Sequence, residues 1–176
     1  MKLFRSGLLS CLALSVIVWS SGTNATLITV DPDYFSDGAI MSAAIPGVNI
    51  TAIGPSTSSG DVFSIGSALS STGSRVFGWP SVYWSPLSAM LKIDFVELTD
   101  YVHIDVIRDG MFFENNVATI FNSSGIPIST SGTGPSGSGV FTVAFDSGGQ
   151  PFSTADIDYM IVYGSSKGGI LIDNLI

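Results

Sequence analysis

The sequence lacks the residues on which several common chemistries depend. It contains one cysteine and one histidine, Cys11 and His103. Neither a disulfide framework nor a cluster of cysteine and histidine metal ligands can therefore be built from this chain. A Ser-His-Asp arrangement would have to use His103, and its neighbour Asp105 would more simply be a solvated residue on the same strand face. We predict that the protein is not an enzyme. Paired carboxylates for glycan hydrolysis are the less favoured alternative.

Basic residues are scarce as well. Six Lys and Arg are outnumbered by fourteen Asp and Glu, which gives a formal net charge of −8. Lys2 and Arg5 lie in an N-terminal segment that we expect to be removed, so four basic and fourteen acidic residues remain, a net charge of −10. This balance disfavours nucleic acid and anionic membranes as partners. Neutral ligands and divalent cations fit it better, and acidity that only keeps the protein in solution is the alternative.

Long apolar runs are confined to the N-terminus. Met1–Ala25 begins with two basic residues, continues with the apolar run Leu8–Val18 and ends in small or polar residues. This order is typical of a secretory signal peptide, so we expect a secreted, extracellular protein. A lipoprotein signal with a lipidated Cys11 is the competing interpretation. No later segment is apolar for the length of a membrane span, which predicts that the processed chain is not stably inserted in a membrane.

The clearest structural pattern lies in Ala89–Val106. Apolar residues occupy every second position in both halves of this segment: Leu91, Ile93, Phe95, Val102, Ile104 and Val106. A period of two with β-branched and aromatic residues is typical of half-buried strands. Because only a short polar break separates the two halves, we predict an antiparallel hairpin.

Further short segments of this kind follow one another after residue 25, separated by polar turns. Strands are predicted at Thr26–Val30, Ala39–Ile45, Val48–Ile53, Asp61–Ile65, Asn116–Asn122, Ile126–Ile128, Val140–Phe145, Ala155–Tyr163 and Ile170–Ile176. This spacing predicts an all-β fold, an antiparallel two-sheet β-sandwich of the jelly-roll type with about ten short strands. We assign Thr26–Ile176 to a single domain.

Three segments need separate treatment. Arg75–Pro86 is rich in aromatic residues but contains two prolines and a glycine, so we predict a loop that crosses between the sheets. Ser129–Gly139 is a low-complexity run that we predict to be a flexible Gly/Ser loop inside the domain. In Ala155–Tyr163, alternation places the Ile and Tyr side chains together on one face.

Several short motifs carry a family resemblance. They are Leu91–Phe95, Tyr101–Ile107, Asn122–Gly125, Ala155–Tyr159 and Leu171–Leu175. In these motifs the chain resembles bacterial exported proteins of the PEP-CTERM-associated kind, whose domain is a jelly-roll sandwich similar to carbohydrate-binding modules of the galactose-binding-like class. The resemblance implies export and a sandwich fold more than any activity. The Pro-Glu-Pro sorting tail of that family does not follow Ile176, so either the protein is released or the sequence is truncated.

Four aspartates are candidate metal ligands. Asp31, Asp33 and Asp37 share one predicted loop, and Asp173 lies near the end of the chain. Calcium prefers carboxylate and carbonyl oxygens, and the resemblance implies that an aspartate such as Asp173 helps to hold a structural ion beside the first strand. If the first and last strands are neighbours, these residues would meet. Structural Ca²⁺ is therefore the candidate cofactor, and ordinary turn aspartates are the alternative.

Aromatic and amide side chains could form a sugar site. Trp79, Tyr83 and Trp84 lie in a predicted loop, and Asn115 and Asn116 follow a second aromatic stretch. Aromatic faces can stack on pyranose rings while amides bind the hydroxyls, so these five are the candidate ligand-binding residues. Large aromatics that fill the core are the alternative.

Taken with the predicted export, these residues indicate a secreted, non-enzymatic module that binds extracellular polysaccharide or matrix. The alternative is a purely structural exoprotein, or a surface-interaction module without a small ligand.

Overall fold

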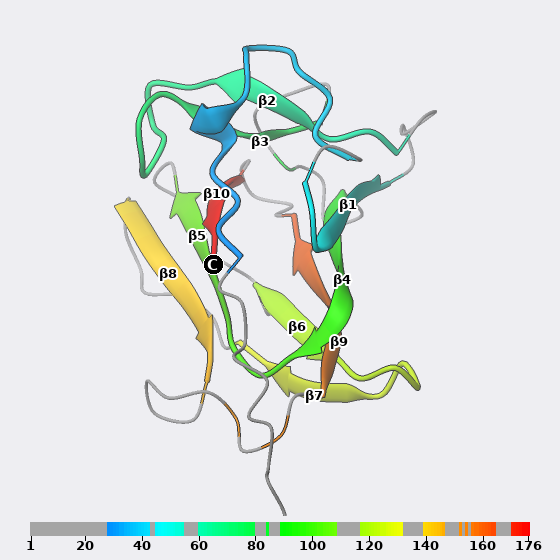
Figure 1. Ribbon diagram of the computed structural model, residues 1–176. Helices are drawn as coiled ribbons and strands as arrows, with labels where there is room; N and C mark the ends of the chain where they lie inside the picture. The colour runs from blue at the N-terminus through cyan, green and yellow to red at the C-terminus, as the bar shows by residue number, and fades with distance from the viewer. Residues whose placement is uncertain are drawn as a thin grey trace, which may run out of the picture.

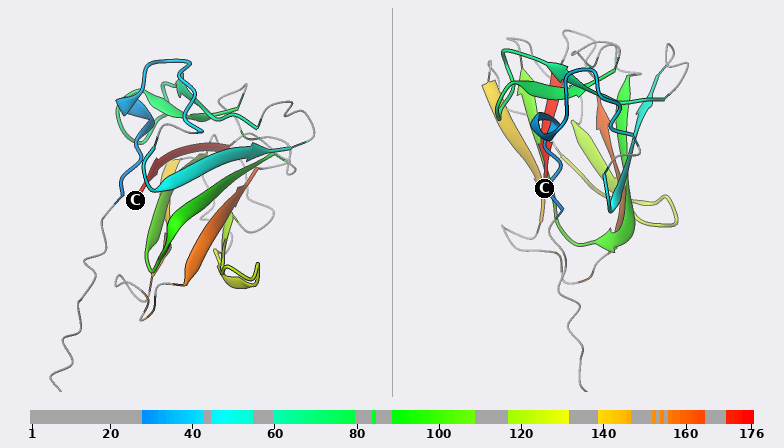
Figure 2. Two further views of the ribbon diagram at one scale, coloured as in Figure 1. Left: turned by 45° about the vertical axis from the view of Figure 1, so that its right-hand side comes forward. Right: turned by 45° about the horizontal axis from the view of Figure 1, so that its top comes forward.

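The strands form two antiparallel sheets of five strands each. The computed structural model describes residues 28–42, 45–54, 60–79, 84, 89–108, 117–131, 139–146, 152, 154, 156–164 and 170–176. The predicted signal peptide and most of the Gly/Ser loop lie outside these ranges. One sheet has the order β1-β4-β9-β6-β7 and the other the order β2-β3-β10-β5-β8 (Figures 1 and 2). The predicted antiparallel β-sandwich is confirmed, and η1, a single 3₁₀ turn at Pro32–Tyr34, is the only helical element in the described ranges.

Strands β3 to β10 follow the jelly-roll order. They pair as β3-β10-β5-β8 in one sheet and as β4-β9-β6-β7 in the other, so the chain changes sheet at every step except between β6 and β7. Strands β1 and β2 each extend one sheet by an additional edge strand. The bounds are β1 Val48–Ile53, β2 Phe63–Gly66, β3 Arg75–Gly78, β4 Met90–Thr99, β5 Val102–Arg108, β6 Ala118–Phe121, β7 Pro127–Thr130, β8 Gly139–Phe145, β9 Ile157–Tyr163 and β10 Ile170–Leu175.

Side chains from the facing sides of the two sheets form the core. Its members without exposed surface include Met41, Ile50, Phe77, Trp84, Leu91, Ile93, Ile104, Ile120, Met160 and Ile172. Full burial of a Leu, Ile or Met side chain contributes about 1.5–3 kcal/mol. This shared apolar layer therefore holds the two sheets face to face.

The predicted hairpin over Ala89–Val106 is wrong in its pairing. Its halves are strands, β4 and β5, and their alternate residues are buried as predicted except Phe95, which is partly buried. The two strands, however, lie in different sheets. Strand β4 pairs with β1 and β9, whereas β5 pairs with β10 and β8. Two strands that each have one apolar face can bury it by facing one another across the core. Alternation alone does not distinguish this arrangement from side-by-side pairing.

The inward face of β9 also differs from the prediction. Ile157 is buried, but farther along the strand the buried residues are Met160 and Val162. The register between β4 and β9 shifts between Asp94 and Thr99, which changes the phase of alternation within β9. The half-exposed residues of the outer face are Tyr159, Ile161 and Tyr163.

The predicted crossing loop at Arg75–Pro86 is wrong at its start, where Arg75–Gly78 is strand β3. Gly78 permits its pairing with β2, because a Cβ at this position would lie 2.1 Å from Cδ1 of Ile65. Farther along, Trp84 forms an isolated bridge to Ile170, donating its N–H to the carbonyl oxygen at 2.8 Å. The aromatic stretch thus contributes to the core of the sandwich.

Candidate functional site

The first described segment and the last strand are neighbours. Val30 donates its N–H to the carbonyl oxygen of Leu175 at 2.8 Å, and Leu175 donates back to Val30 at 3.0 Å. This pair places Asp31 and the η1 turn beside the end of β10, which carries Asp173. The aspartates at the two ends of the described chain therefore approach the same outer side of the β2-β3-β10-β5-β8 sheet.

The 67–74 loop, Ser67–Ser74 between β2 and β3, connects these aspartates. Thr72 donates its hydroxyl to Oδ1 of Asp31 at 3.4 Å and its N–H to Oδ2 of Asp173 at 3.1 Å. The N–H of Ser71 reaches the same Asp173 oxygen at 2.7 Å. Backbone donors of one loop thus bind a carboxylate of β10, which fixes the loop over the sheet.

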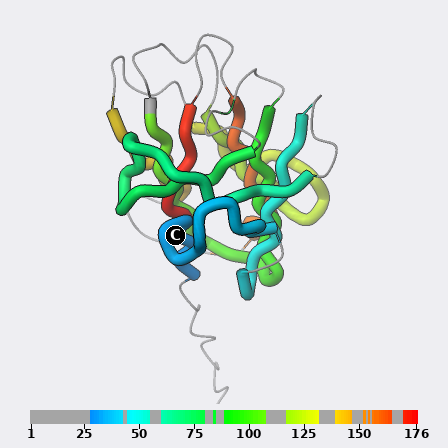
Figure 3. The backbone as a smooth tube through the Cα atoms, turned by 90° about the horizontal axis from the view of Figure 1, so that it is seen from above, coloured from blue at the N-terminus to red at the C-terminus, as the bar shows by residue number. Residues whose placement is uncertain are grey.

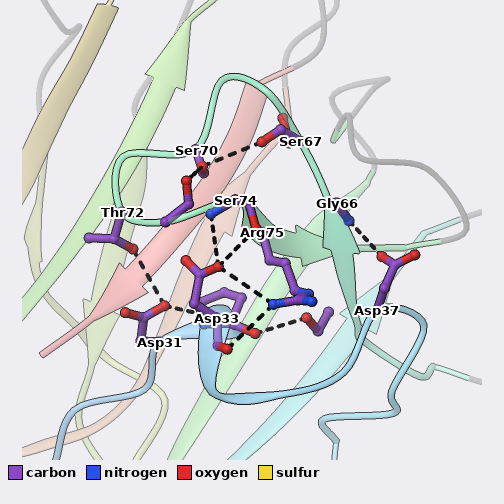
Figure 4. A network of polar contacts seen from close by, with 12 residues as sticks. Asp31, Asp33, Asp37, Gly66, Ser67, Ser70, Thr72, Ser74 and Arg75 are labelled. Carbon is purple, nitrogen blue, oxygen red and sulfur yellow. Dashed lines mark hydrogen bonds and ion pairs between the residues drawn. The ribbon is translucent and has the colours of Figure 1, made fainter.

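Asp33 and Asp37 hold the ends of the 67–74 loop (Figure 4). Oδ1 of Asp33 accepts the N–H of Ser74 at 2.8 Å and lies 3.7 Å from Nη1 of Arg75. Oδ1 of Asp37 accepts the N–H of Gly66 at 2.7 Å. The other oxygen of Asp33, Oδ2, is buried and accepts no hydrogen bond from any described residue.

Asp173 has no exposed surface. Burial raises the pKa of Asp173 above its ordinary value of 3.8, against the opposing effect of hydrogen bonds from Ser71, Thr72 and Asn174. Asp105 lies directly opposite Asp173 on β5. The Ser71 hydroxyl lies 2.8 Å from Oδ2 of Asp173 and 3.0 Å from Oδ2 of Asp105. The single hydroxyl proton of Ser71 can be donated to only one of these two oxygens at a time.

The four predicted metal ligands take part in hydrogen bonds in this arrangement, and calcium binding stays a prediction. Calcium takes about six to eight oxygen ligands, whereas oxygens of all four carboxylates here accept N–H or O–H groups. Within the described ranges, no group of three or more His, Cys, Asp and Glu side chains is placed to hold a metal ion. The geometry supports a structural role for these aspartates, which anchor the 67–74 loop.

The two described tryptophans of the predicted sugar site lie in the core. Trp79 is 6% and Trp84 0% exposed, and their ring centroids are 6.0 Å apart. Nε1 of Trp84 donates to the carbonyl oxygen of Phe77 at 2.8 Å. Stacking on a sugar requires an open ring face, which neither residue presents. The other candidates, Tyr83, Asn115 and Asn116, lie outside the described residues.

His103 and Asp105 do not interact as the pair considered above. Nε2 of His103 lies 3.0 Å from Oδ2 of Asp146, and its Nδ1 lies 3.0 Å from the Tyr101 hydroxyl. Asp105 instead accepts hydrogen bonds from Ser71 and Thr142. The histidine therefore connects the start of β5 to the end of β8.

One short sequence pattern was missed by the sequence analysis. Gly164–Gly168 matches Gly-x-Ser-x-Gly, which in hydrolases marks a nucleophile between a strand and a helix. Here the element that follows is strand β10. Residues 165–169, which include the serine of the pattern, lie outside the described ranges.

A second polar and aromatic group crosses the outer face of the β1-β4-β9-β6-β7 sheet. We name it the outer row, and it consists of Asn49, Lys92, Asp94, Phe121 and Tyr159, contributed by β1, β4, β6 and β9. The rings of Phe121 and Tyr159 stack with centroids 4.7 Å apart and an interplanar angle of 10°. Nζ of Lys92 lies 4.6 Å from the Tyr159 ring centroid and forms an ion pair with Asp94. Unlike the tryptophans, these aromatic rings remain partly exposed.

Comparison with known proteins gives a likeness of fold alone. No protein-family model and no curated protein matches the chain. Among solved structures, the enzymatically active domain of bacteriophage CBA120 tailspike protein 4 is similar, with a TM-score of 0.37 and 14% sequence identity. The match covers 74% of this chain and 19% of that one, so the chain spans about a fifth of its length. No helix in the described ranges has the length and apolar character to cross a membrane.

Proposed function

We propose that the protein is an exported, non-enzymatic β-sandwich module that binds an extracellular polysaccharide through the outer row. The observation that carries the proposal is the Phe121–Tyr159 ring pair, which stays half-exposed on an open sheet face. Amide and carboxylate groups at Asn49 and Asp94 lie in the same cross-strand row. Aromatic surface beside such groups suits a neutral polymer with apolar ring faces and many hydroxyls.

The composition and the resemblance support the same proposal. The acidic balance of the chain disfavours polyanionic partners, and an uncharged polysaccharide carries no charge to be repelled. The PEP-CTERM-associated proteins and galactose-binding-like modules that the sequence resembles are exported or carbohydrate-binding sandwiches. The N-terminal segment Met1–Ala25 has the order of a signal peptide.

A purely structural module is the second candidate, and one observation favours it. The Tyr159 ring already has Phe121 against it at 4.7 Å and the Lys92 ammonium over it at 4.6 Å. A sugar that stacks on Tyr159 would have to displace Lys92. In a structural module, by contrast, this arrangement would serve only to stabilise the outer face of the sheet by cross-strand contacts.

Affinity electrophoresis through gels that contain neutral polysaccharides separates the two candidates. We expect the polysaccharide to retard the wild-type protein. Tyr159→Ala should raise the apparent dissociation constant at least tenfold. Tyr34→Ala is the matched control, because this tyrosine is 75% exposed and belongs to η1, away from the outer row. An equal loss in both variants would show that the outer row is not the site. No retardation of the wild type across a broad panel of polysaccharides would leave the structural module as the function.

A further inference from the structure

We infer that β8 is a self-association edge, at which two copies of the chain join their β2-β3-β10-β5-β8 sheets into one continuous sheet. β8 is the last strand in the order of its sheet, and it forms the border of the molecule in Figures 1 and 3. It pairs with β5 over seven consecutive residues without a register shift. Its outer edge is thus a long, regular row of backbone donors and acceptors, which is a template for another strand.

The hydrogen-bonding direction of each β8 residue follows from its neighbour β5. His103 exchanges both backbone hydrogen bonds with Ile176, at 2.7 and 2.8 Å, so its backbone groups point toward the β10 side. In an antiparallel ladder the direction alternates with each residue. The residues of β8 opposite Val102, Ile104, Val106 and Arg108 therefore bond to β5. The residues whose backbone groups point away from β5 are Val140, Thr142 and Ala144.

The other sheet edges are protected in the described structure, and β8 is not. Strand β2 is covered by the segment 38–41, through bonds such as Ser64 N–H to the Ala39 oxygen at 2.9 Å. Strand β7 contains Pro127 and lies beside a register shift. Strand β1 donates the N–H of Ala52 to Gly60 at 2.8 Å. The sequence of β8, GVFTVAF, contains no charged residue and no proline, although these are the usual devices that keep strand edges apart.

A second copy suits this edge because the outward side chains are self-complementary. Antiparallel pairing about a twofold axis at Thr142 sets Thr142 against its own copy and the larger Val140 against the smaller Ala144. Threonine pairs of this kind are favourable across strands. The nearest carboxylate on the same face, Asp105 on β5, would be about 14 Å from its copy, at about 4.8 Å for each of three strand spacings. This exceeds the Debye length of about 8 Å in physiological salt, so repulsion is largely screened.

Sedimentation velocity from about 10 µM to 1 mM, on the whole purified protein, tests the inference. Pairing of one strand buries less than the standard interface of about 1,600 Å², so we expect a weak, concentration-dependent dimer. Thr142→Pro removes an N–H that faces away from β5, and we expect it to raise the dissociation constant at least tenfold. Thr51→Lys on β1 adds a charge in the other sheet, away from β8, and should leave the dimer intact.

A second variant and a second readout keep the test decisive if Thr142→Pro does not fold. Ala144→Lys should also weaken the dimer at least tenfold, because it places a charge on the exposed edge. In the wild type, the amides of Val140, Thr142 and Ala144 should become protected from hydrogen exchange as concentration rises. A monomer at 1 mM, or a dimer that both β8 variants leave unchanged while these amides stay unprotected, would overturn the inference. Neither result bears on polysaccharide binding, which concerns the other sheet.

Discussion

The carboxylate of Asp33 occupies the place that a side chain at Gly73 would need. A Cβ built on Gly73 would lie 2.3 Å from Oδ2 of Asp33, and Gly73 has a positive φ of +44°. The glycine thus permits both the turn of the 67–74 loop and the close approach of the aspartate. This contact brings η1 and the β2–β3 connection together.

Gly73→Ala should therefore destabilise the protein more than its backbone strain alone explains. Gly38→Ala is the matched control, since Gly38 also has a positive φ, +77°, but no atom lies within 4 Å of its Cβ position. We expect a loss of about 1–2 kcal/mol for Gly38→Ala, and at least about 1 kcal/mol more for Gly73→Ala. Urea unfolding measures both, and equal losses would contradict the contact. Adding Asp33→Ala should shrink the extra loss at position 73.

Acidification should favour the native state through Asp173. Because burial raises the folded-state pKa of Asp173 above 3.8, the folded protein binds this proton more tightly than the unfolded chain. The stabilisation is fully present below pH 3.8 and is lost as the pH rises through the raised pKa. We compare the free energy of unfolding of the wild type with that of Asp173→Asn. The difference, wild type minus variant, should fall as the pH rises through this window, by about 1.4 kcal/mol for each unit by which the pKa is raised. A difference that rises with pH would contradict the assignment.

Trp84 should contribute to stability without taking part in polysaccharide binding. Trp84→Phe removes the donor to the Phe77 carbonyl oxygen and should cost about 1–3 kcal/mol. Trp84→Ala should cost about 3–5 kcal/mol because it also leaves a cavity. Tyr34→Ala, at an exposed position, should change stability by less than about 0.5 kcal/mol. Reduced retardation by polysaccharide in a folded Trp84→Phe variant would restore this residue as a ligand contact.

Removal of divalent cations should leave the fold unchanged. The carboxylates of Asp31, Asp33, Asp37 and Asp173 already accept hydrogen bonds from backbone or side-chain donors. A ligand that binds the native state raises the melting temperature, so EDTA and added Ca²⁺ should give the same transition within about 1 °C. A melting temperature that falls by several degrees in EDTA would show that these aspartates hold an ion.

The sequence was sufficient for most of the strands and for part of the site, but not for strand pairing. Strand β3 was predicted as a loop, and the predicted strand at Ala39–Ile45 is, in its described part, only an isolated bridge at Ile40. Alternation at Leu91 and Ile104 identifies the buried faces of the strands. It does not predict which sheet a strand joins, because the choice of sheet depends on partner strands far along the chain. Strand β9 has apolar residues on both faces, so the inward Met160 could not be distinguished from the outward Tyr159. The outer row was missed for this reason.

The aspartates that lie around one loop were named together from the sequence, whereas their donors were not. Ser71 and Thr72 belong to a run of small polar residues that has the composition of a flexible loop. Their ordering comes from Asp173, about a hundred residues later. Local composition contains no signal for a contact of this range.

The position of β10 has a consequence for the time course of folding. It is the last strand in sequence, yet it lies in the middle of its sheet, between β3 and β5. The early strands of that sheet have no partner across this gap until the end of the chain is available. The entropy cost of closing such long loops is incurred before their contacts stabilise the fold. Folding should therefore be slow, on the order of milliseconds to seconds. In a nascent chain with this strand order, the β2-β3 pair and the β5-β8 pair would therefore stay separate until β10 joins them into one sheet.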